Sequence, residues 1–163
     1  MIIRENVPLA PLTTLGVGGP ARYFAEPTTE AEIVEAVEFS RSQNVPLFVL
    51  GGGSNLVVAD TGFAGLVLKI AIAKVTRRDS TFTAGAGCDW DALVAQTIEL
   101  GYAGLECLSG IPGTVGGTPV QNVGAFCAGE GCDRAAGAGV GEPGPAAHRH
   151  AGHAEAQGAR DLR

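Results

Sequence analysis

Three consecutive glycines separate two apolar runs near the first third of the chain. Residues 47–50 read Leu-Phe-Val-Leu, residues 51–53 are glycine, Ser54 and Asn55 follow, and residues 56–58 read Leu-Val-Val. The entering run is typical of a buried strand. Because glycine has no Cβ, its backbone can adopt positive φ and approach a ligand, and successive N–H groups can form an anion-binding nest. The stretch predicts either a phosphate-binding loop or a tight turn between two strands.

Chain length and charge limit the classes of protein that can contain such a loop. A length of 163 residues favours one domain, or two small lobes that share a core. The formal net charge of −6 at pH 7 argues against a nucleic-acid binder, because that affinity requires clustered Lys and Arg. The apolar run at 66–73 is too short to span a bilayer and contains Lys69, so we expect no membrane insertion.

The N-terminal residues and the cysteines indicate the compartment. Residues 1–6 contain no long apolar segment of the kind found in signal peptides. The four cysteines form no Cys-x-x-Cys pair, and we expect them to be free thiols in a reducing environment. The sequence therefore predicts a cytoplasmic protein.

Hydrophobic periodicity predicts alternating strands and helices. Thr29 stands three residues before Glu32, which is the spacing of a capping box, and apolar residues then recur at helical period. A helix between two strands implies that those strands are parallel. We expect strands at 22–25, 47–50, 56–58, 65–70 and 81–84, a polar turn at 77–80, and helices at about 30–43 and 90–100. Gly101 is expected to end the second helix, and one face of that helix carries Leu93, Val94, Thr97 and Ile98.

The segment Gly-Ala-Gly at 85–87 imitates a dinucleotide-binding motif. It follows a predicted strand and precedes a predicted helix, but the sixth position of the motif is Trp90 instead of Gly or Ala. We interpret the segment as a strand-to-helix turn with Asp89 as the helix N-cap. A Walker loop is excluded because neither Lys69 nor Lys74 follows a glycine.

A second glycine-rich stretch occupies residues 109–117. Pro112 and Gly113 indicate a turn, and the glycines would let main chain lie against a ligand. Thr114 can cap a short helix whose first N–H groups would face an anion. The alternative is a loop that only packs against the sheet, which leaves the nearby polar residues Ser109 and Gln121 unexplained.

Four groups of residues resemble the UDP-N-acetylenolpyruvoylglucosamine reductase family, in the family's order and over residues 1–126. They are Thr-x-x-Val-Gly-Gly-x-Ala at 14–21, Leu-Gly-Gly-Gly-Ser-Asn-Leu at 50–56 with Asp-x-Gly-Phe-x-Gly at 60–65, Ala-Gly-Ala-Gly at 84–87, and Gly-Leu-Glu-x-Leu-Ser-Gly-Ile-Pro-Gly-Thr-Val-Gly-Gly at 104–117 continuing to Ala125. The resemblance implies an α/β (α+β) protein with the FAD-binding fold of the p-cresol methylhydroxylase and vanillyl-alcohol oxidase type. Its two lobes would comprise residues 1–77 and the start of the second lobe, 78–126.

The resemblance also implies a cofactor site for FAD. Residues 51–55 would hold the pyrophosphate, and residues 109–117 would lie along the diphosphate and the flavin. The implied FAD-binding residues are Gly51, Gly52, Gly53, Ser54, Asn55, Leu56, Ser109, Gly110, Ile111, Pro112, Gly113, Thr114, Gly116, Gly117 and Gly124.

The implied reaction belongs to peptidoglycan precursor synthesis. NADPH, the co-substrate, passes hydride to FAD, and the reduced flavin reduces a nucleotide-sugar substrate, UDP-N-acetylglucosamine enolpyruvate, to UDP-N-acetylmuramate. The family's catalytic serine, glutamate and arginine have no matching positions here, so no catalytic residue is assigned and the chain is expected to be inactive alone. Two alternatives remain: a non-catalytic FAD- or nucleotide-binding fragment, and another oxidase of the same flavin fold.

The C-terminal segment, residues 127–163, departs from the family pattern. Val140 and Leu162 are its only large aliphatic residues, and it has no aromatic residue. Such a segment buries too little apolar surface to offset its ordering entropy, so we expect it to be disordered and non-native, as after a frameshift near residue 127. Its three histidines, with Cys127 and Cys132, could suggest a metal site, but we interpret them as products of biased composition and expect no metal.

Overall fold

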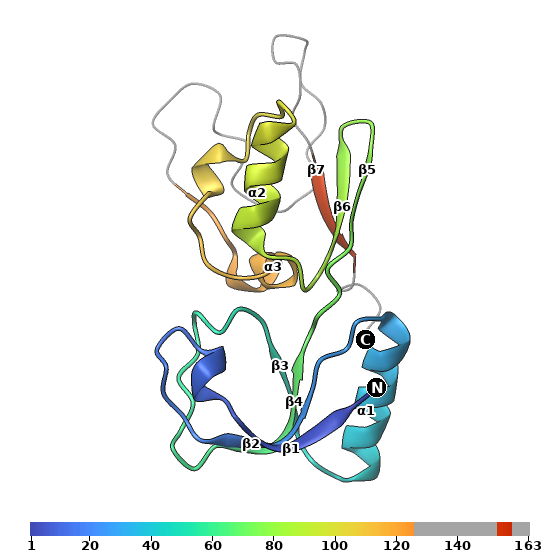
Figure 1. The fold of residues 1–163 in the computed structure, drawn as a ribbon, viewed down its shortest axis with the longest axis vertical. Helices are drawn as coiled ribbons and strands as arrows, with labels where there is room; N and C mark the ends of the chain where they lie inside the picture. The colour runs from blue at the N-terminus through green and yellow to red at the C-terminus, as the bar shows by residue number, and fades with distance from the viewer. Residues whose placement is uncertain (126–152, 158–163) are drawn as a thin grey trace. The chain divides into compact units, whose positions relative to one another are not determined.

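A computed structural model describes residues 1–125 and 153–157. The chain divides into two compact units, Met1–Ile72 and Ala73–Arg163 (Figure 1). The predicted lobe boundary at residue 77 falls inside strand β5 (Val75–Arg78), which pairs with the next strand of the second unit. The division therefore comes a few residues earlier in the chain than the lobe boundary that the resemblance implied.

The first unit contains a four-stranded sheet and one α-helix. Strand β1 is antiparallel to β2, whereas β2 and β3 are both parallel to the strand between them, β4. The sheet order is β1-β2-β4-β3, formed by β1 (Ile3–Pro8), β2 (Pro20–Ala25), β4 (Phe63–Lys69) and β3 (Leu47–Leu50). The predicted parallel arrangement of the strands before and after the helix is confirmed, although a later strand lies between them.

Helix α1 (Glu30–Ser42) covers one face of this sheet (Figure 1). Thr29 is its N-cap, and the Thr29 hydroxyl oxygen accepts a hydrogen bond from the Glu32 N–H at 3.3 Å. The Glu32 carboxylate returns to Thr28, where it accepts from the N–H and the hydroxyl, so the capping box is displaced by one residue. The helix buries Ala36 against Leu66 and Leu68 of β4.

The opposite face of the sheet is covered by irregular chain. Leu9 and the 3₁₀ helix η1 (Ala10–Leu12) pack there over Phe24 and Val67. The strand predicted at 56–58 is wrong, because this segment is irregular. The segment leads into a hydrogen-bonded turn and not into a β-ladder. The carbonyl of Ala59, which follows it, accepts hydrogen bonds from the N–H groups of Gly19 and Gly62.

The second unit combines a three-stranded sheet with short helices. Strand β6 lies in the centre, antiparallel to β5 and parallel to β7. Asp79, with φ 55°, turns the chain between β5 and β6, so the predicted turn is confirmed at 79–80, whereas Arg77 and Arg78 belong to β5. The elements are β5, β6 (Thr81–Gly85), α2 (Trp90–Glu99), η2 (Glu106–Leu108), η3 (Val115–Gly117), α3 (Thr118–Gln121) and β7 (His153–Gln157).

Helix α2 supplies Trp90, Leu93 and Val94 to the core of the second unit. Its N-cap is Asp89, whose carboxylate accepts from the Ala92 N–H at 2.8 Å, and Gly101 follows its end with φ +79°, as predicted. Ile98 lies at the margin of the buried stripe and is 43% exposed. The core contains Phe82, Ala84, Cys88, Trp90, Leu93, Val94, Leu108 and Val115.

The C-terminal segment is described only in part. We expected no ordered structure over residues 127–163, and the structure describes His153–Gln157 as β7, paired with β6. The remainder, with the histidines at 148 and 150 and the cysteines at 127 and 132, lies outside the described residues.

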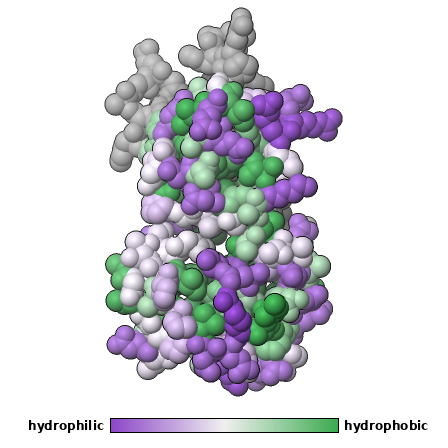
Figure 2. Space-filling view, in the orientation of Figure 1, coloured by the Kyte–Doolittle hydropathy of each residue, from purple (hydrophilic) through white to green (hydrophobic). Residues whose placement is uncertain are grey.

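Apolar side chains reach the surface among hydrophilic ones in each unit (Figure 2). Val57 in the first unit and Val120 in the second are 71% and 83% exposed. Among the helices in the described ranges, none has both the length and the apolar character that crossing a membrane requires.

Candidate functional site

The first glycine loop, residues 51–55, follows the carboxyl end of strand β3. That strand is parallel to β4, and ligands of open α/β sheets bind beyond the carboxyl ends of parallel strands. Gly53 adopts φ +70°, and its carbonyl accepts a hydrogen bond from the Thr14 N–H at 3.0 Å. The loop is therefore hydrogen-bonded to residues 9–19, which connect β1 to β2 and are called the N-terminal arm below, at the end of the sheet where a ligand is expected.

Packing within the protein already requires glycine at position 53. A Cβ built there would lie 2.1 Å from the Leu12 carbonyl oxygen and 2.9 Å from the Thr13 Cα. Both atoms belong to backbone, which cannot move as the end of a flexible side chain can. Gly53 thus serves the close approach of the arm to the loop, in addition to any ligand contact.

The N–H groups of Gly52 and Gly53 make no hydrogen bond to another part of the chain within the residues that the structure describes. Successive backbone donors in a loop with a left-handed residue form an anion-binding nest. A diphosphate suits such a site because its oxygens accept hydrogen bonds and carry negative charge. The first glycine loop therefore fits the diphosphate of a nucleotide cofactor.

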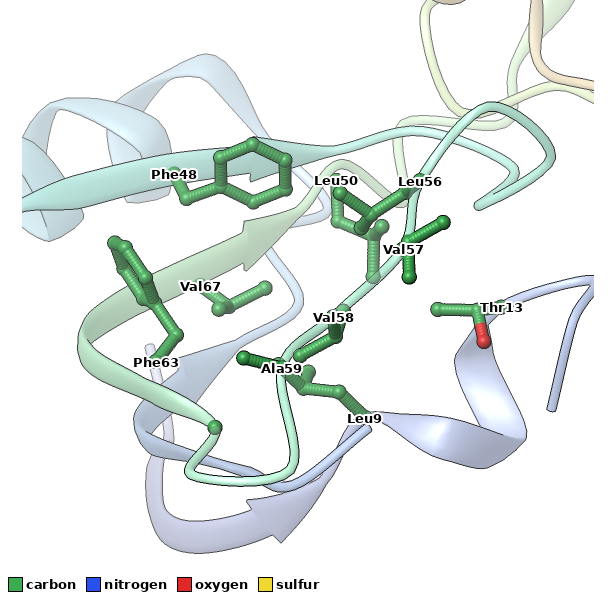
Figure 3. A pocket seen from close by; sticks show the side chains of 11 residues that line it. Leu9, Thr13, Phe48, Leu50, Leu56, Val57, Val58, Ala59, Phe63 and Val67 are labelled. Carbon is green, nitrogen blue, oxygen red and sulfur yellow. The ribbon is translucent and has the colours of Figure 1, made fainter. Parts of the chain in front are cut away.

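A pocket of about 160 Å³ lies in the first unit beside this loop (Figure 3). Phe48 of β3 and Phe63 of β4 face each other at one end, with ring centroids 5.9 Å apart, and Thr13 lies at the other end. The Thr13 hydroxyl already donates to backbone carbonyls of the arm. The pocket can take a small apolar group; it is lined by Leu9, Thr13, Phe48, Leu50, Leu56, Val57, Val58, Ala59, Gly62, Phe63 and Val67.

The second glycine loop, residues 109–117, begins against the first turn of helix α2. Asp91 Oδ1 accepts hydrogen bonds from the Ser109 hydroxyl at 2.8 Å and from the Gly110 N–H at 2.7 Å. Both hydrogen bonds lower the pKa of Asp91 below its ordinary value of 3.8, and the bond from the Gly110 N–H has a larger effect than the bond from the Ser109 hydroxyl. The carboxylate therefore stays ionised at neutral pH and fixes both loop residues.

Trp90 holds the same loop from the buried side. Its indole N–H donates to the Leu108 carbonyl at 2.9 Å, and its backbone N–H donates to the Gly113 carbonyl at 3.1 Å. Ile111 packs against the core of the second unit, so its side chain is directed into the protein. Two consecutive residues of α2 thus hold the loop at several points.

The far end of this loop does not form the predicted anion site. Thr114 is the N-cap of η3, but its side chain makes no capping hydrogen bond. The next three N–H groups donate to protein carbonyls: Val115 to Cys88, Gly116 to Ala86 and Gly117 to Thr114. The interpretation that this short helix presents its first N–H groups to an anion is therefore wrong, because the carbonyls of Cys88, Ala86 and Thr114 accept their hydrogen bonds.

The glycines of the second loop have different surroundings. A Cβ on Gly116 would lie 2.7 Å from the Ala86 Cβ, so packing requires this glycine. Gly113 and Gly117 lie beside the side-chain amide of Gln121. Gly110, with φ +77°, has no atom of the described residues within 4 Å of a built Cβ, and neither has Gly124. Within the described residues, the space beside Gly110 and Gly124 is therefore open to a ligand.

Sequence reasoning missed Asp91, Trp90 and the pocket. Asp91 is 18 residues from Ser109, and an acidic residue in the first turn of a helix is common for reasons of capping and dipole alone. Within residues 1–125 and 153–157, no cluster of three His, Cys, Asp or Glu side chains could hold a metal ion. Within the part of the chain that the structure describes, Cys88 and Cys107 are not joined by a disulfide.

Comparison with known proteins identifies the class to which this fold and these loops belong. A model of the FAD binding domain family matches residues 21–150. The chain therefore belongs to the FAD binding domain family, and its residues present a glycine loop that suits the diphosphate of that cofactor.

The particular relatives are UDP-N-acetylenolpyruvoylglucosamine reductases. The reductase of Streptomyces avermitilis is 49% identical over 122 residues, which are 75% of this chain and 34% of the relative. That of Nocardia farcinica is 53% identical over 124 residues, 76% of this chain and 32% of the relative. The chain spans about a third of the length of these curated relatives.

A solved structure shows the same similarity in three dimensions. The crystal structure of UDP-N-acetylenolpyruvylglucosamine reductase from Thermus caldophilus matches with a TM-score of 0.58 and 36% identity, over 76% of this chain and 44% of that chain. The predicted resemblance to the reductase family and the predicted α/β (α+β) FAD-binding fold are confirmed.

Proposed function

We propose that the chain binds the diphosphate of FAD at the first glycine loop. The observation that carries this proposal is the pair of N–H groups on Gly52 and Gly53, which are not used within the described residues, at the carboxyl end of a parallel strand. Backbone donors of this kind can bind phosphate oxygens without the help of a lysine side chain, and the sequence has no lysine in a Walker motif. Ser54, Asn55 and Leu56 complete the predicted contact.

When bound, FAD supplies the hydride chemistry, and the chain supplies binding and orientation. The N–H groups of the first glycine loop offset the negative charge of the diphosphate. In the second unit, the Asp91 and Trp90 contacts fix residues 108–113 in one conformation before any ligand arrives. A ligand that meets this loop therefore does not have to order it, which preserves affinity.

For the whole protein we propose the reaction of its relatives. NADPH would be the co-substrate and a nucleotide sugar, UDP-N-acetylglucosamine enolpyruvate, would be reduced to UDP-N-acetylmuramate, in the cytoplasm and for peptidoglycan synthesis. The 163-residue chain would bind FAD without this turnover, because no residue of it matches the family's catalytic serine, glutamate or arginine. The chain spans about a third of the relatives' length, which supports assigning FAD binding to this chain and turnover to the whole protein.

Equilibrium binding tests the proposal with two flavins, of which only FAD carries the diphosphate and the adenosine that follows it. The purified chain is titrated into FAD and, separately, into riboflavin, which has the flavin ring and no diphosphate, while flavin fluorescence is recorded. We expect saturable binding of one FAD per chain and at least about tenfold weaker binding of riboflavin, since losing charge-assisted hydrogen bonds to the diphosphate costs at least about 1.4 kcal/mol. Equal affinity for both ligands, or binding of neither, contradicts the proposal.

A further inference from the structure

Asp91 makes two hydrogen bonds that lie outside the buried core of the second unit. Its side chain is exposed, and the two residues that it holds, Ser109 and Gly110, are exposed as well. Trp90 already joins α2 to the loop through a buried indole N–H on the Leu108 carbonyl. The buried Trp90–Leu108 hydrogen bond explains why the loop stays against the helix. The exposed hydrogen bonds to Asp91 determine how Ser109 and Gly110 are oriented.

We infer that Asp91 is a positioning residue, which holds Ser109 and Gly110 in the orientation that FAD meets. This inference rests on the proposed binding of FAD. Gly110 is the glycine of this loop with positive φ and no atom of the described chain within 4 Å of a built Cβ. A ligand can therefore approach the Cα of Gly110 closely, provided that the neighbouring hydroxyl and N–H group stay in place.

The direction of the hydrogen bonds defines what this part of the loop offers. The Ser109 hydroxyl donates its proton to Asp91, and the Gly110 N–H is used in the same way. What remains toward a ligand is the hydroxyl oxygen of Ser109 as an acceptor and the open side of Gly110. This surface suits an N–H or hydroxyl group and a flat ring face of FAD better than it suits a phosphate, whose oxygens need donors.

Two variants separate orientation from charge. Asp91→Ala removes both acceptor contacts, whereas Asp91→Asn keeps an oxygen at the same place and removes only the charge. Glu99→Ala is the matched control, because Glu99 is an exposed carboxylate in the last turn of the same helix. Far-UV circular dichroism of each variant establishes that the fraction folded is the same before FAD is added.

We expect Asp91→Ala to raise the Kd for FAD about tenfold, Asp91→Asn to stay within about threefold of the unsubstituted chain, and Glu99→Ala to change nothing. Amide hydrogen exchange of Gly110 without FAD should be faster in Asp91→Ala than in Asp91→Asn. Weak binding by Asp91→Asn equal to that of Asp91→Ala would overturn the inference, because charge would then be the cause. Unchanged affinity in Asp91→Ala, with faster exchange, would overturn the positioning role and leave the proposed function standing. An unsubstituted chain that binds no FAD would overturn both.

Discussion

The Leu12 carbonyl oxygen lies where the side chain of residue 53 would begin, so that a Cβ on Gly53 would stand 2.1 Å from it. The N-terminal arm and the first glycine loop are therefore packed backbone against backbone. A substitution in this loop acts on the first unit itself before it acts on any cofactor, and binding data alone would misattribute its effect.

Gly53→Ala should destabilise the first unit strongly. The residue would combine the cost of a left-handed conformation, about 1–2 kcal/mol, with a backbone clash of about 1–3 kcal/mol. Gly16→Ala is the matched control, because Gly16 has φ +65° and no atom of the described chain within 4 Å of a built Cβ. Urea unfolding should give a loss of about 1–2 kcal/mol for the control and about 2–5 kcal/mol for Gly53→Ala. Equal losses would mean that the arm does not constrain the loop.

Gly110→Ala should act on FAD affinity more than on stability. Gly110 and Gly101 both have positive φ and open space around a built Cβ, so the strain of an added methyl group, about 1–2 kcal/mol, is similar at the two positions. If FAD approaches Gly110, only Gly110→Ala should raise the Kd, by about tenfold or more. The same Kd for both variants would place the ligand elsewhere on the loop.

Asp91 should contribute to stability only above its ordinary pKa. Hydrogen bonds from the Gly110 N–H and the Ser109 hydroxyl lower the pKa of Asp91 in the folded chain from 3.8, so the unfolded chain binds this proton more readily. The contribution is therefore complete well above pH 3.8 and is lost as pH falls through the lowered pKa. The difference in unfolding free energy between the unsubstituted chain and Asp91→Asn should shrink with acidification. A difference that is constant with pH would contradict this assignment.

Local signals in the sequence predicted local structure well. Thr29 and Asp89 were expected as N-caps and make those hydrogen bonds, and Gly101 ends α2. The errors concern pairing across the chain. Residues 56–58 have strand composition but no ladder partner, and the N–H groups at 115–117 are used by carbonyls at 86, 88 and 114, which no periodicity reveals.

The candidate site could be predicted as two glycine loops but not as a set of contacts. The motif order indicated both loops and the family, and the comparisons confirm the family. It could not separate glycines that serve packing, such as Gly53 and Gly116, from glycines that leave open space, such as Gly110. That distinction depends on which backbone atoms meet each glycine, and those atoms come from distant parts of the sequence.

The 163-residue chain should not oxidise NADPH in the presence of FAD and UDP-N-acetylglucosamine enolpyruvate. Turnover requires a proton donor and a charge cluster held in one geometry with the flavin, and the resemblance assigns the family's serine, arginine and glutamate to no residue of this chain. A steady-state absorbance assay on the purified chain measures this directly. Substrate-dependent oxidation that heating abolishes would mean that other residues of the chain supply these groups.

The binding of the FAD diphosphate at the first glycine loop is tested most directly by NMR of the loop amides while FAD is added. In an ¹⁵N-labelled chain, FAD should shift the amide resonances of Gly52 and Gly53, and riboflavin, which lacks the diphosphate, should leave them unchanged. Gly16, in the same unit and outside the loop, serves as the internal reference. Saturable FAD binding that leaves the Gly52 and Gly53 amides unmoved would contradict the claim that this loop holds the diphosphate.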